Sequence, residues 1–413
     1  MAKIVPFRGI LYNVARVSMD DVLAPPYDVI TPEYREALYM QSPYNIVRID
    51  FGKEKPEDSE TENKYTRARE YLDAWEKEGV FIRSEKPSFY AYEMSYMIHS
   101  VQKRLIGLLA LVKLEELGKG NIYPHECTHA KPKQDRLNLM RACEANTSPI
   151  FSLYKSSERN IADILSEVAK TTPYIESNDI SGDIHRLWQI DDAGTIETIT
   201  KELEDKAVFI ADGHHRYETA YEYYREMTKK GSPAGERSFD HVLMFLANML
   251  DEGISILPTH RLLKEIHEDM EKLLSEYFEI EPVQGNFNIA EVLSGKRRVF
   301  GLYRGGNRVW HILKYKGGNL SDTPHELRDV DVIILHELLL KKLLQTADIG
   351  YEMNIEKVLE KVNNGEFRAA FFLNPTRVED VEKSALSLVR MPPKSTYFYP
   401  KLLTGLVINR WQV

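Results

Sequence analysis

The sequence predicts a mixed α/β protein in which most β-strands run antiparallel. Residues 89–96 and 103–113 are rich in β-branched and aromatic residues and flank a polar turn, which is typical of two antiparallel strands. Amphipathic segments of helical period alternate with such runs along the chain. Residues 207–220 join both types, because an apolar run ends at Asp212-Gly213 and a helical pattern starts at His214. These three observations favour the mixed α/β class.

The first elements are short. Thr31 followed by Pro32 indicates a helix start, with a capping residue and a proline in the first helical position. Residues 44–51 alternate between apolar and polar types and predict a strand. Residues 65–79 predict an amphipathic helix that ends at a glycine cap. The next predicted elements are helix 134–145, strand 150–154, helix 161–169, strand 184–190, helix 195–204, strand 208–211, helix 214–230 and strands 241–249 and 254–257.

From about residue 265 the sequence pattern changes to alternating helices and short strands. Strands at 297–303 and 308–313 precede a strongly apolar helix at 330–344. We therefore expect two domains, a core with insertions at 1–262 and a smaller α/β region at 263–413 whose terminal segment returns to the candidate site.

Composition places the chain among ordinary globular proteins. Of its 413 residues 43% are hydrophobic and 28% are charged, and the formal net charge is −9. The acidic balance argues against a dedicated nucleic-acid binder. The longest apolar run, 105–114, contains Lys113 and is too short to span a bilayer, and the N-terminus does not resemble a signal peptide. With only two cysteines, we expect a cytoplasmic protein without membrane or nucleic-acid partners.

The strand–glycine–helix junction is the strongest candidate site. A helix N-terminus attracts anions through its free N–H groups and dipole, and Gly213 allows close backbone approach. Arg216 can bind phosphate oxygens by a forked contact, and Asp212 can hold Mg²⁺. His214 and His215 can hydrogen-bond phosphate or move protons. Alternatively, Asp212 caps the helix and the histidines pack on the strand.

A second cluster, at 125–129, matches the H-E-x-x-H pattern of zinc proteases through His125, Glu126 and His129. That chemistry needs a sustained helix, whereas Pro124 and Pro132 bracket the motif. We therefore interpret it as a loop that offers His125 and Glu126 to a site.

Three further groups carry charge. Lys133 and Arg136 either face an anionic substrate or lie in a solvated helix start. His260 and Arg261 follow a strand and either join the site or are structural. The proline-rich segment 391–401 presents four polar side chains that we expect to serve function, although it also suits a domain closure: Lys394, Ser395, Thr396 and Lys401.

Five blocks of the sequence together resemble the DUF1015 family of bacterial and archaeal proteins. They cover nearly the whole chain in the expected order: A-P-P-Y-D at 24–28, H-E-x-T at 125–128 with D-R at 135–136, A-D-G-H-H-R-Y-x-T-A at 211–220, P-T-H-R at 258–261, and M-P-P-K-S-T-Y-F-Y-P-K at 391–401. The strand–turn–helix unit also resembles a phosphate-binding box of the ParB/sulfiredoxin-like superfamily, which implies a nucleotide-binding core of that fold.

Free L-serine kinases of that superfamily carry a similar turn, and the resemblance implies ATP-dependent phosphorylation of free L-serine. The chain lacks the G-x-x-x-x-G-K-[ST] loop, so the phosphates need a different cradle. We assign the cradle to Gly213, His214, His215 and Arg216, and the positioning of Mg²⁺ or of the phosphate to Asp212. Glu126 is the first candidate for general base and Asp28 the second, with His125 sharing protons. The candidates for binding ATP phosphates or the amino-acid carboxylate are Lys133, Arg136, His260, Arg261, Lys394 and Lys401. The hydroxyls of Ser395 and Thr396 are candidates for donating hydrogen bonds to phosphate oxygens.

Two other functions remain open at this point. A ParB-like nucleotide switch would bind or hydrolyse nucleotide without amino-acid chemistry. A metal hydrolase would hold zinc at 125–129. The sequence leaves open ATP or ADP as donor, the identity of the hydroxyl acceptor and the oligomeric state.

Overall fold

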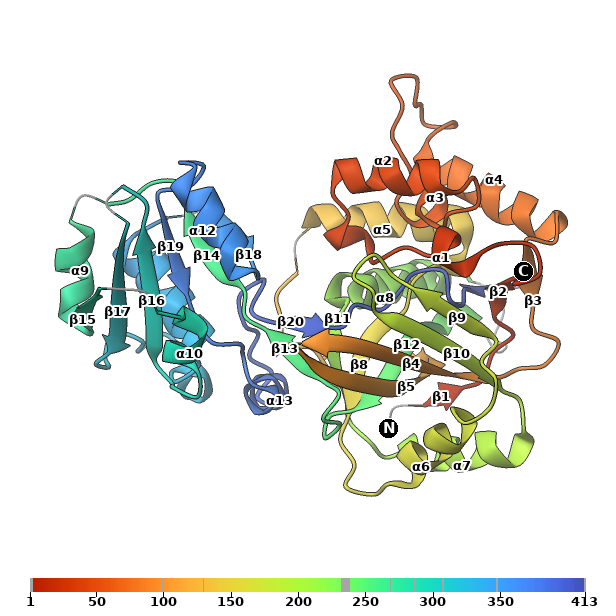
Figure 1. The fold of residues 1–413 in the computed structure, drawn as a ribbon. Coiled ribbons are helices and arrows are strands. Elements are labelled where there is room, and N and C mark those ends of the chain that lie inside the picture. Colours follow the sequence, from red (N-terminus) through yellow and green to blue (C-terminus); the bar gives the residue numbers. More distant parts are fainter. Residues whose placement is uncertain are drawn as a thin grey trace. The chain divides into compact units, whose positions relative to one another are not determined.

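The computed structural model describes residues 3–98, 100–128, 130–231, 238–267, 269–284, 287–306, 308–346 and 348–411. The chain forms two compact units (Figure 1). The first comprises Met1–Pro124, Thr128–Ser255 and Pro400–Val413, and the second comprises His125–Cys127 and Ile256–Tyr399. The sequence-based division at 262–263 falls inside strand β14 (His260–Leu263) of the second unit.

The first unit is built on a nine-stranded sheet with the order β6-β11-β8-β12-β5-β4-β10-β9, and β1 pairs with β5. The β6–β11 and β8–β12 pairs are parallel, and the other pairs in this sheet are antiparallel. The strands are β1 (Ile4–Val5), β4 (Phe89–Ile98), β5 (Val101–Lys113), β6 (Ile122–Tyr123), β8 (Ile150–Tyr154), β9 (Ile175–Asn178), β10 (Ile184–Ile190), β11 (Val208–Asp212) and β12 (His241–Asn248). Two small pairs also belong to this unit: β2 (Ile10–Tyr12) with β3 (Phe81–Arg83), and β7 (Ala145–Asn146) with β21 (Asn409–Arg410).

Helices of the first unit pack on one another and on the sheet. α4 packs on α5 and α5 on α8 (Figure 1). Apolar side chains of α6, α7 and α8 belong to the same core. Residues 105–112 of β5 are all buried, so both faces of this strand are covered. The helices are α1 (Met19–Val22), α2 (Pro32–Gln41), α3 (Val47–Asp50), α4 (Lys64–Lys77), α5 (Ala130–Cys143), α6 (Asn160–Val168), α7 (Ala193–Leu203) and α8 (His214–Lys229).

The second unit contains a six-stranded sheet in which the pairs are antiparallel, with the order β15-β17-β16-β19-β14-β18. Helices α10 and α12 bury their apolar side chains against this sheet. Its elements are β13 (Ser255–Leu257), β14, α9 (Met270–Tyr277), β15 (Phe278–Val283), α10 (Ile289–Leu293), β16 (Val299–Arg304), β17 (Val309–Tyr315), α11 (Asp331–Ile333), a π-helix (Ile334–Leu343), β18 (Ile349–Glu352), α12 (Ile355–Asn363), β19 (Ala369–Phe372), α13 (Val378–Leu386) and β20 (Tyr397–Tyr399).

The predicted mixed α/β class with mostly antiparallel strands is confirmed. The strands predicted at 150–154 and 184–190 match β8 and β10 residue for residue, and Thr31 caps α2 by accepting a hydrogen bond from the Tyr34 N–H (3.2 Å). The predicted strand at 44–51 is wrong, because residues 47–50 form helix α3. The Asn45 side chain starts this turn: its Oδ1 accepts from the Val47 N–H and its Nδ2 donates to the Leu23 carbonyl.

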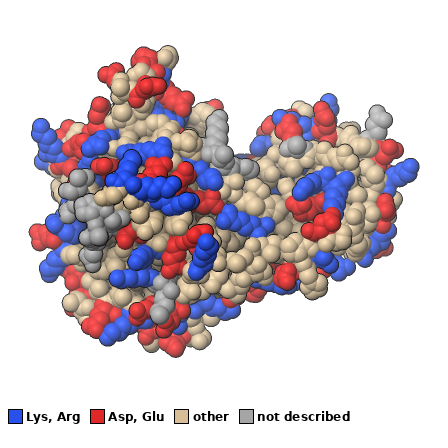
Figure 2. All heavy atoms as spheres, turned by 180° about the vertical axis from the view of Figure 1, so that it is seen from behind, with Lys and Arg blue, Asp and Glu red and all other residues tan. Residues whose placement is uncertain are grey.

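Charge is distributed over the surface in both signs. On the face drawn in Figure 2, basic and acidic side chains are intermixed. None of the helices in the described ranges has the length and apolarity needed to span a membrane.

Gly107 of β5 gives a test of this packing. A β-carbon there would lie 2.5 Å from the Phe245 ring and 2.7 Å from the Leu246 carbonyl oxygen. We expect Gly107→Ala to lower the free energy of unfolding by about 1–3 kcal/mol through overpacking. Gly194→Ala in α7 is the control, since its β-carbon meets only Asp192 Oδ2 at 3.4 Å. Urea unfolding of both variants checks this, and equal stability of the two would contradict it.

Candidate functional site

The junction between β11 and α8 adopts the predicted turn. β11 ends at Asp212, and Gly213 stands at the N-cap of α8 with φ +94° and ψ 27°. Only glycine adopts this left-handed conformation without strain. Gly213 makes no side-chain cap, and the positive end of the α8 dipole at this turn favours anions.

Asp212 is held on both carboxylate oxygens. Its Oδ1 accepts a hydrogen bond from the Gly213 N–H (2.8 Å), and its Oδ2 lies 2.8 Å from the Lys401 ammonium. The two side chains are largely buried, with exposed fractions of 23% and 14%. Lys401 lies in the C-terminal segment that returns to the first unit, and the Thr404 N–H of this segment donates to the Ala24 carbonyl (2.8 Å). The structure thus joins the D-G-H-H-R turn, the C-terminal lysine and the Pro-Pro loop.

Arg216 supports the turn from within. Its guanidinium is buried, donates to the Pro149 carbonyl, and lies so close that a β-carbon on Gly213 would sit 2.9 Å from its Nε. His214 is buried as well, and His215 is half-buried. Arg216 therefore ties the start of α8 to the start of β8, and its role as a phosphate fork stays a prediction.

Glu218 is a residue that the sequence analysis missed. It lies one turn after His214 in α8, and its Oε2 accepts hydrogen bonds from the Thr128 hydroxyl (2.6 Å) and the Lys133 ammonium (3.0 Å). Residues four apart share a helix face, so the spacing from His214 was the available signal. The predicted substrate ligand Lys133 is thus paired with a carboxylate of the candidate site.

Arg136 belongs to a buried ion network. Its guanidinium, 6% exposed, donates to Asp135 Oδ2 and lies 3.3 Å from Asp50 Oδ1, which also accepts from the Thr147 hydroxyl (2.7 Å). Burial alone lowers the pKa of Arg136, but the two carboxylates outweigh it and the pKa is raised. For Asp135 the effects have the opposite sign. Burial raises its pKa, but the positive charges of Arg136 and Lys64 outweigh burial and lower the pKa to about 2.

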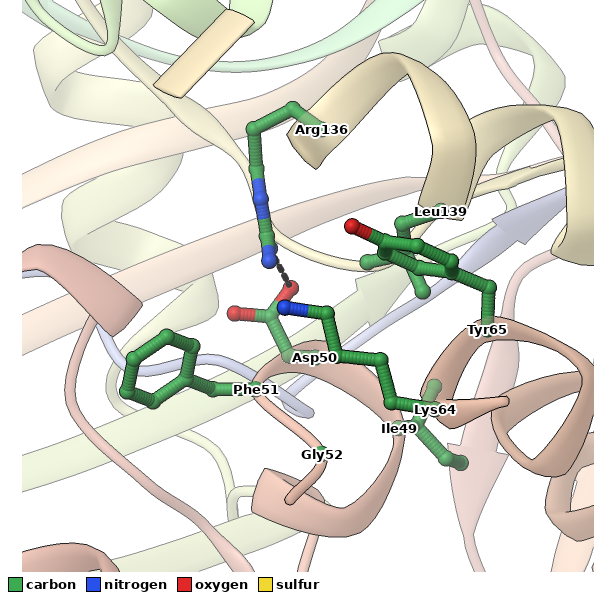
Figure 3. Close-up of a pocket in the computed structure, with 8 residues that line it drawn as sticks. All are labelled: Ile49, Asp50, Phe51, Gly52, Lys64, Tyr65, Arg136 and Leu139. Atoms are coloured by element: carbon green, nitrogen blue, oxygen red, sulfur yellow. Dashed lines mark hydrogen bonds and ion pairs between the residues drawn. The ribbon is translucent and has the colours of Figure 1, made fainter. Parts of the chain in front are cut away.

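The same network lines a small pocket, in which the side chains of α3, α4 and α5 converge (Figure 3). The pocket is lined by Ile49, Asp50, Phe51, Gly52, Lys64, Tyr65, Arg136 and Leu139. Because Arg136 is buried and paired with two carboxylates, it does not lie in a solvated helix start, and its contact with an anionic substrate stays a prediction.

The Pro-Pro loop brings Tyr27 to this network. The Arg136 guanidinium lies 4.2 Å from the centre of the Tyr27 ring. Burial raises the pKa of Tyr27 to about 12, although Arg136 and Arg216 oppose the shift, so the hydroxyl stays protonated. Asp28, the second candidate for general base, is exposed on the neighbouring position.

The second unit holds the His-Glu residues in extended backbone. Glu126 forms a parallel bridge with Met391, with hydrogen bonds from the Met391 N–H to the His125 carbonyl (2.7 Å) and from the Cys127 N–H to the Met391 carbonyl (3.1 Å). A zinc-protease helix is therefore absent at 125–127, which agrees with the interpretation of the motif as a loop; His129 lies outside the described residues. The His125 Nε2 is hydrogen-bonded to the Thr396 hydroxyl (2.9 Å), and Glu126 Oε1 accepts from the Lys394 N–H (2.8 Å).

The remaining predicted ligands are largely engaged inside this unit. The buried Ser395 hydroxyl donates to the Pro392 carbonyl (2.6 Å), and the fully buried Arg261 donates to the Lys394 carbonyl (2.8 Å). His260 packs on Phe372 with ring centres 4.8 Å apart, and burial, then the Arg261 charge, lowers its pKa to about 3. A neutral, core-packed His260 fits the structural alternative.

A magnesium ion has limited support from the protein alone. Among the described residues, no three His, Cys, Asp or Glu side chains gather in a way that holds a metal. Mg²⁺ in nucleotide sites uses one or two carboxylates together with phosphate oxygens. Asp212 fits that donor set if Lys401 shares the carboxylate, so it would hold the ion only together with a nucleotide.

Residues 4–333 match the family described as "Protein of unknown function (DUF1015)". The chain belongs to this family. No curated protein matches it.

Among solved structures, a conserved hypothetical protein from Pyrococcus furiosus aligns at 14% identity and a TM-score of 0.37 over 70% of this chain and 91% of that one. A free serine kinase in complex with AMP aligns at 13% identity and 0.36 over 69% and 92%. SbnI with a C-terminal truncation, from Staphylococcus aureus, aligns at 12% identity and 0.37 over 72% and 85%. With TM-scores below 0.5, these likenesses carry no inference about this chain.

The depressed pKa of Asp135 gives a prediction about acid stability. A carboxylate whose pKa is about 2 when folded and near 4 when unfolded stabilises the fold above pH 4, and this contribution is lost as the pH falls from 4 to 2. We expect Asp135→Asn to cost about 2 kcal/mol at pH 7 by leaving Arg136 with fewer partners.

The measurement is urea unfolding of wild type and Asp135→Asn between pH 3 and 7. The difference in unfolding free energy should shrink below pH 4. Asp163→Asn, which removes an exposed pair with Arg159, is the control and should show almost no difference. A pH-independent difference for Asp135→Asn would contradict the assignment.

Proposed function

We propose that the protein is an ATP-dependent phosphotransferase whose acceptor is the hydroxyl of free L-serine. The observation that carries this proposal is the contact of Asp212 with both Gly213 and Lys401 at the N-terminus of α8. It brings together the glycine turn, the carboxylate and the helix dipole at the start of α8 with an ammonium from the C-terminal segment. This combination suits phosphate oxygens and a metal-bound nucleotide.

Phosphoryl transfer needs positioning and charge neutralisation more than covalent chemistry from the protein. The backbone N–H groups of the first α8 turn and the Lys401 ammonium would neutralise phosphate oxygens. Arg216 would hold the turn rigid by its bond to Pro149. Magnesium, when bound, would spread the charge of the transferred group, and Asp212 would contribute one ligand to it.

The nature of the acceptor rests on the sequence resemblance of the turn to that of free L-serine kinases. Attack by a serine hydroxyl requires a base that takes its proton. Glu126 is our first candidate, because its carboxylate is held by the Lys394 N–H and is half-buried, whereas Asp28 is exposed. Lys133 would contribute positive charge toward the amino-acid carboxylate, with Glu218 fixing its ammonium.

Incubation of the protein with ATP, Mg²⁺ and a panel of amino acids and polyols tests the activity. We expect O-phosphoserine and an acceleration of ADP formation by L-serine. Nucleotide binding or slow hydrolysis that no acceptor accelerates would support a ParB-like switch instead. Replacement of ATP by ADP in the same assay identifies the donor.

Lys401→Met tests the phosphate cradle. Loss of the ammonium should raise the KM for ATP and lower kcat/KM by about 10–100-fold, since a charge-assisted contact is worth about 1.5–3 kcal/mol. Lys229→Met, at the far end of α8, removes an exposed lysine and should leave the kinetics unchanged. Steady-state kinetics at varied ATP concentration measure the KM for ATP and kcat/KM of both variants. Equal effects of the two substitutions would exclude a specific role for Lys401.

Glu126→Gln tests the base. It should reduce kcat by at least about 100-fold, the usual contribution of a general base, while ADP still binds with unchanged affinity. Asp28→Asn serves as the comparison. If Asp28→Asn abolishes turnover and Glu126→Gln does not, then the exposed carboxylate is the base and our assignment is wrong.

A further inference from the structure

Lys394 occupies a strained backbone conformation. Its φ is +62°, in the left-handed region that long side chains rarely adopt. Such a conformation persists only where the surroundings hold it, and strain of this kind concentrates at functional positions. The neighbouring contacts must therefore explain why a lysine rather than a glycine stands there.

Two side chains hold the backbone of Lys394 from both ends. Its N–H donates to Glu126 Oε1 (2.8 Å), and its carbonyl accepts from Arg261 Nη2 (2.8 Å). The next residue is fixed too, because the Ser395 carbonyl accepts from the Thr376 hydroxyl (2.7 Å). We call residues 392–395 the Lys394 turn.

Arg261, which holds the Lys394 carbonyl, is a buried cation without a hydrogen-bonded carboxylate in the described part of the chain. It is completely buried, and its guanidinium donates to the backbone carbonyls of Thr259 and Lys394 and lies 5.0 Å from the Tyr351 ring centre. Its Nε has no hydrogen-bond partner among the described residues. Burial lowers its pKa to about 10, opposed by Tyr351 and Glu126. A buried cation bound mainly by carbonyls costs stability, and an apolar side chain of similar volume is often at least as stable.

The Lys394 side chain contrasts with the rest of its segment. The hydroxyls of Ser395 and Thr396 are bonded within the second unit. The Lys394 side chain is exposed, and its ammonium makes no hydrogen bond or ion pair with any residue in the described ranges. The Lys394 turn therefore presents one positive charge to solvent. The backbone that carries this charge is held in place next to Glu126.

We propose that Arg261 is a positioning residue that acts through Lys394. By holding the strained turn, it fixes the Lys394 ammonium relative to the Glu126 carboxylate, so that the ammonium binds an anionic group of a ligand. The ligand is either the nucleotide phosphate or the acceptor carboxylate, and this part rests on the proposed function. Arg261 itself does not contact the ligand, in contrast to the role that the sequence suggested for it.

A double-mutant cycle separates positioning from simple structural support. Arg261→Met and Lys394→Ala should each lower kcat/KM at least tenfold, and the double variant should be no worse than Lys394→Ala alone. A rise in the KM for ATP identifies the phosphate as the anion, and a rise in the KM for serine identifies the carboxylate. Multiplicative losses, or unchanged KM values for both substrates, would overturn the proposal.

Two controls accompany the cycle. Lys383→Ala removes another exposed lysine of the same unit, on α13, and should leave both KM values unchanged. Arg261→Met should melt at the wild-type temperature or above it. If it fails to fold, Arg261→Lys keeps the charge but loses the forked geometry, and it should show the same kinetic defect to a smaller degree.

Amide hydrogen exchange tests the turn without any substrate. In Arg261→Met the amide of Lys394 should exchange at least tenfold faster, while the amides of β14, β16 and β19 keep their protection. Unchanged exchange at Lys394 would overturn the holding role of Arg261. If wild type lacks kinase activity but exchange at Lys394 accelerates, then the proposed function fails while the structural part of the inference stands.

Discussion

The candidate site depends on the bridging carboxylate of Asp212. One of its oxygens fixes the Gly213 N–H and the other holds Lys401, which is 189 residues away in the sequence. The first contact is local and sets the left-handed turn that starts α8. The second recruits the C-terminal segment into the first unit, where Thr404 pairs with the backbone of Ala24. The Asp212 side chain thus links the start of α8 to the C-terminal segment, and the backbone of that segment pairs with Ala24.

This arrangement explains how anion binding can arise without a phosphate-binding glycine loop of the usual sequence. A helix N-terminus offers partial positive charge, but its effect falls off within the first turn. Lys401 adds a full charge at that place, and its largely buried pairing with Asp212 limits screening by solvent. Arg216 differs from Lys401 in its role. It is buried, and its hydrogen bond to the Pro149 carbonyl anchors the turn.

Local patterns predicted much of the fold and less of the site. The β11–Gly213–α8 junction was predictable because the apolar run, the glycine and the helical period lie within a few residues. Residues 44–51 have the alternation of a strand, but long-range contacts of Asn45 with Leu23 convert them to a helix. The pairing of Lys401 with Asp212 and that of Lys133 with Glu218 need tertiary structure. No periodicity reveals which charged residue is buried, so Arg136 and Arg261 looked like surface ligands in the sequence.

Buried arginines of the two units illustrate different uses of the same residue type. Arg136 is matched by two carboxylates, and their attraction raises its pKa although burial opposes the shift. Arg261 is bonded to carbonyls instead, and burial lowers its pKa to about 10. In a matched ion pair, the attraction between the charges offsets the cost of desolvation. A buried cation without a bonded carboxylate lacks this attraction and adds little to the stability of the fold. What Arg261 does supply is a hydrogen bond to the carbonyl of Lys394, a residue whose backbone has φ +62°. We therefore attribute the burial of Arg261, despite its cost in stability, to its role in holding the exposed Lys394 ammonium in place.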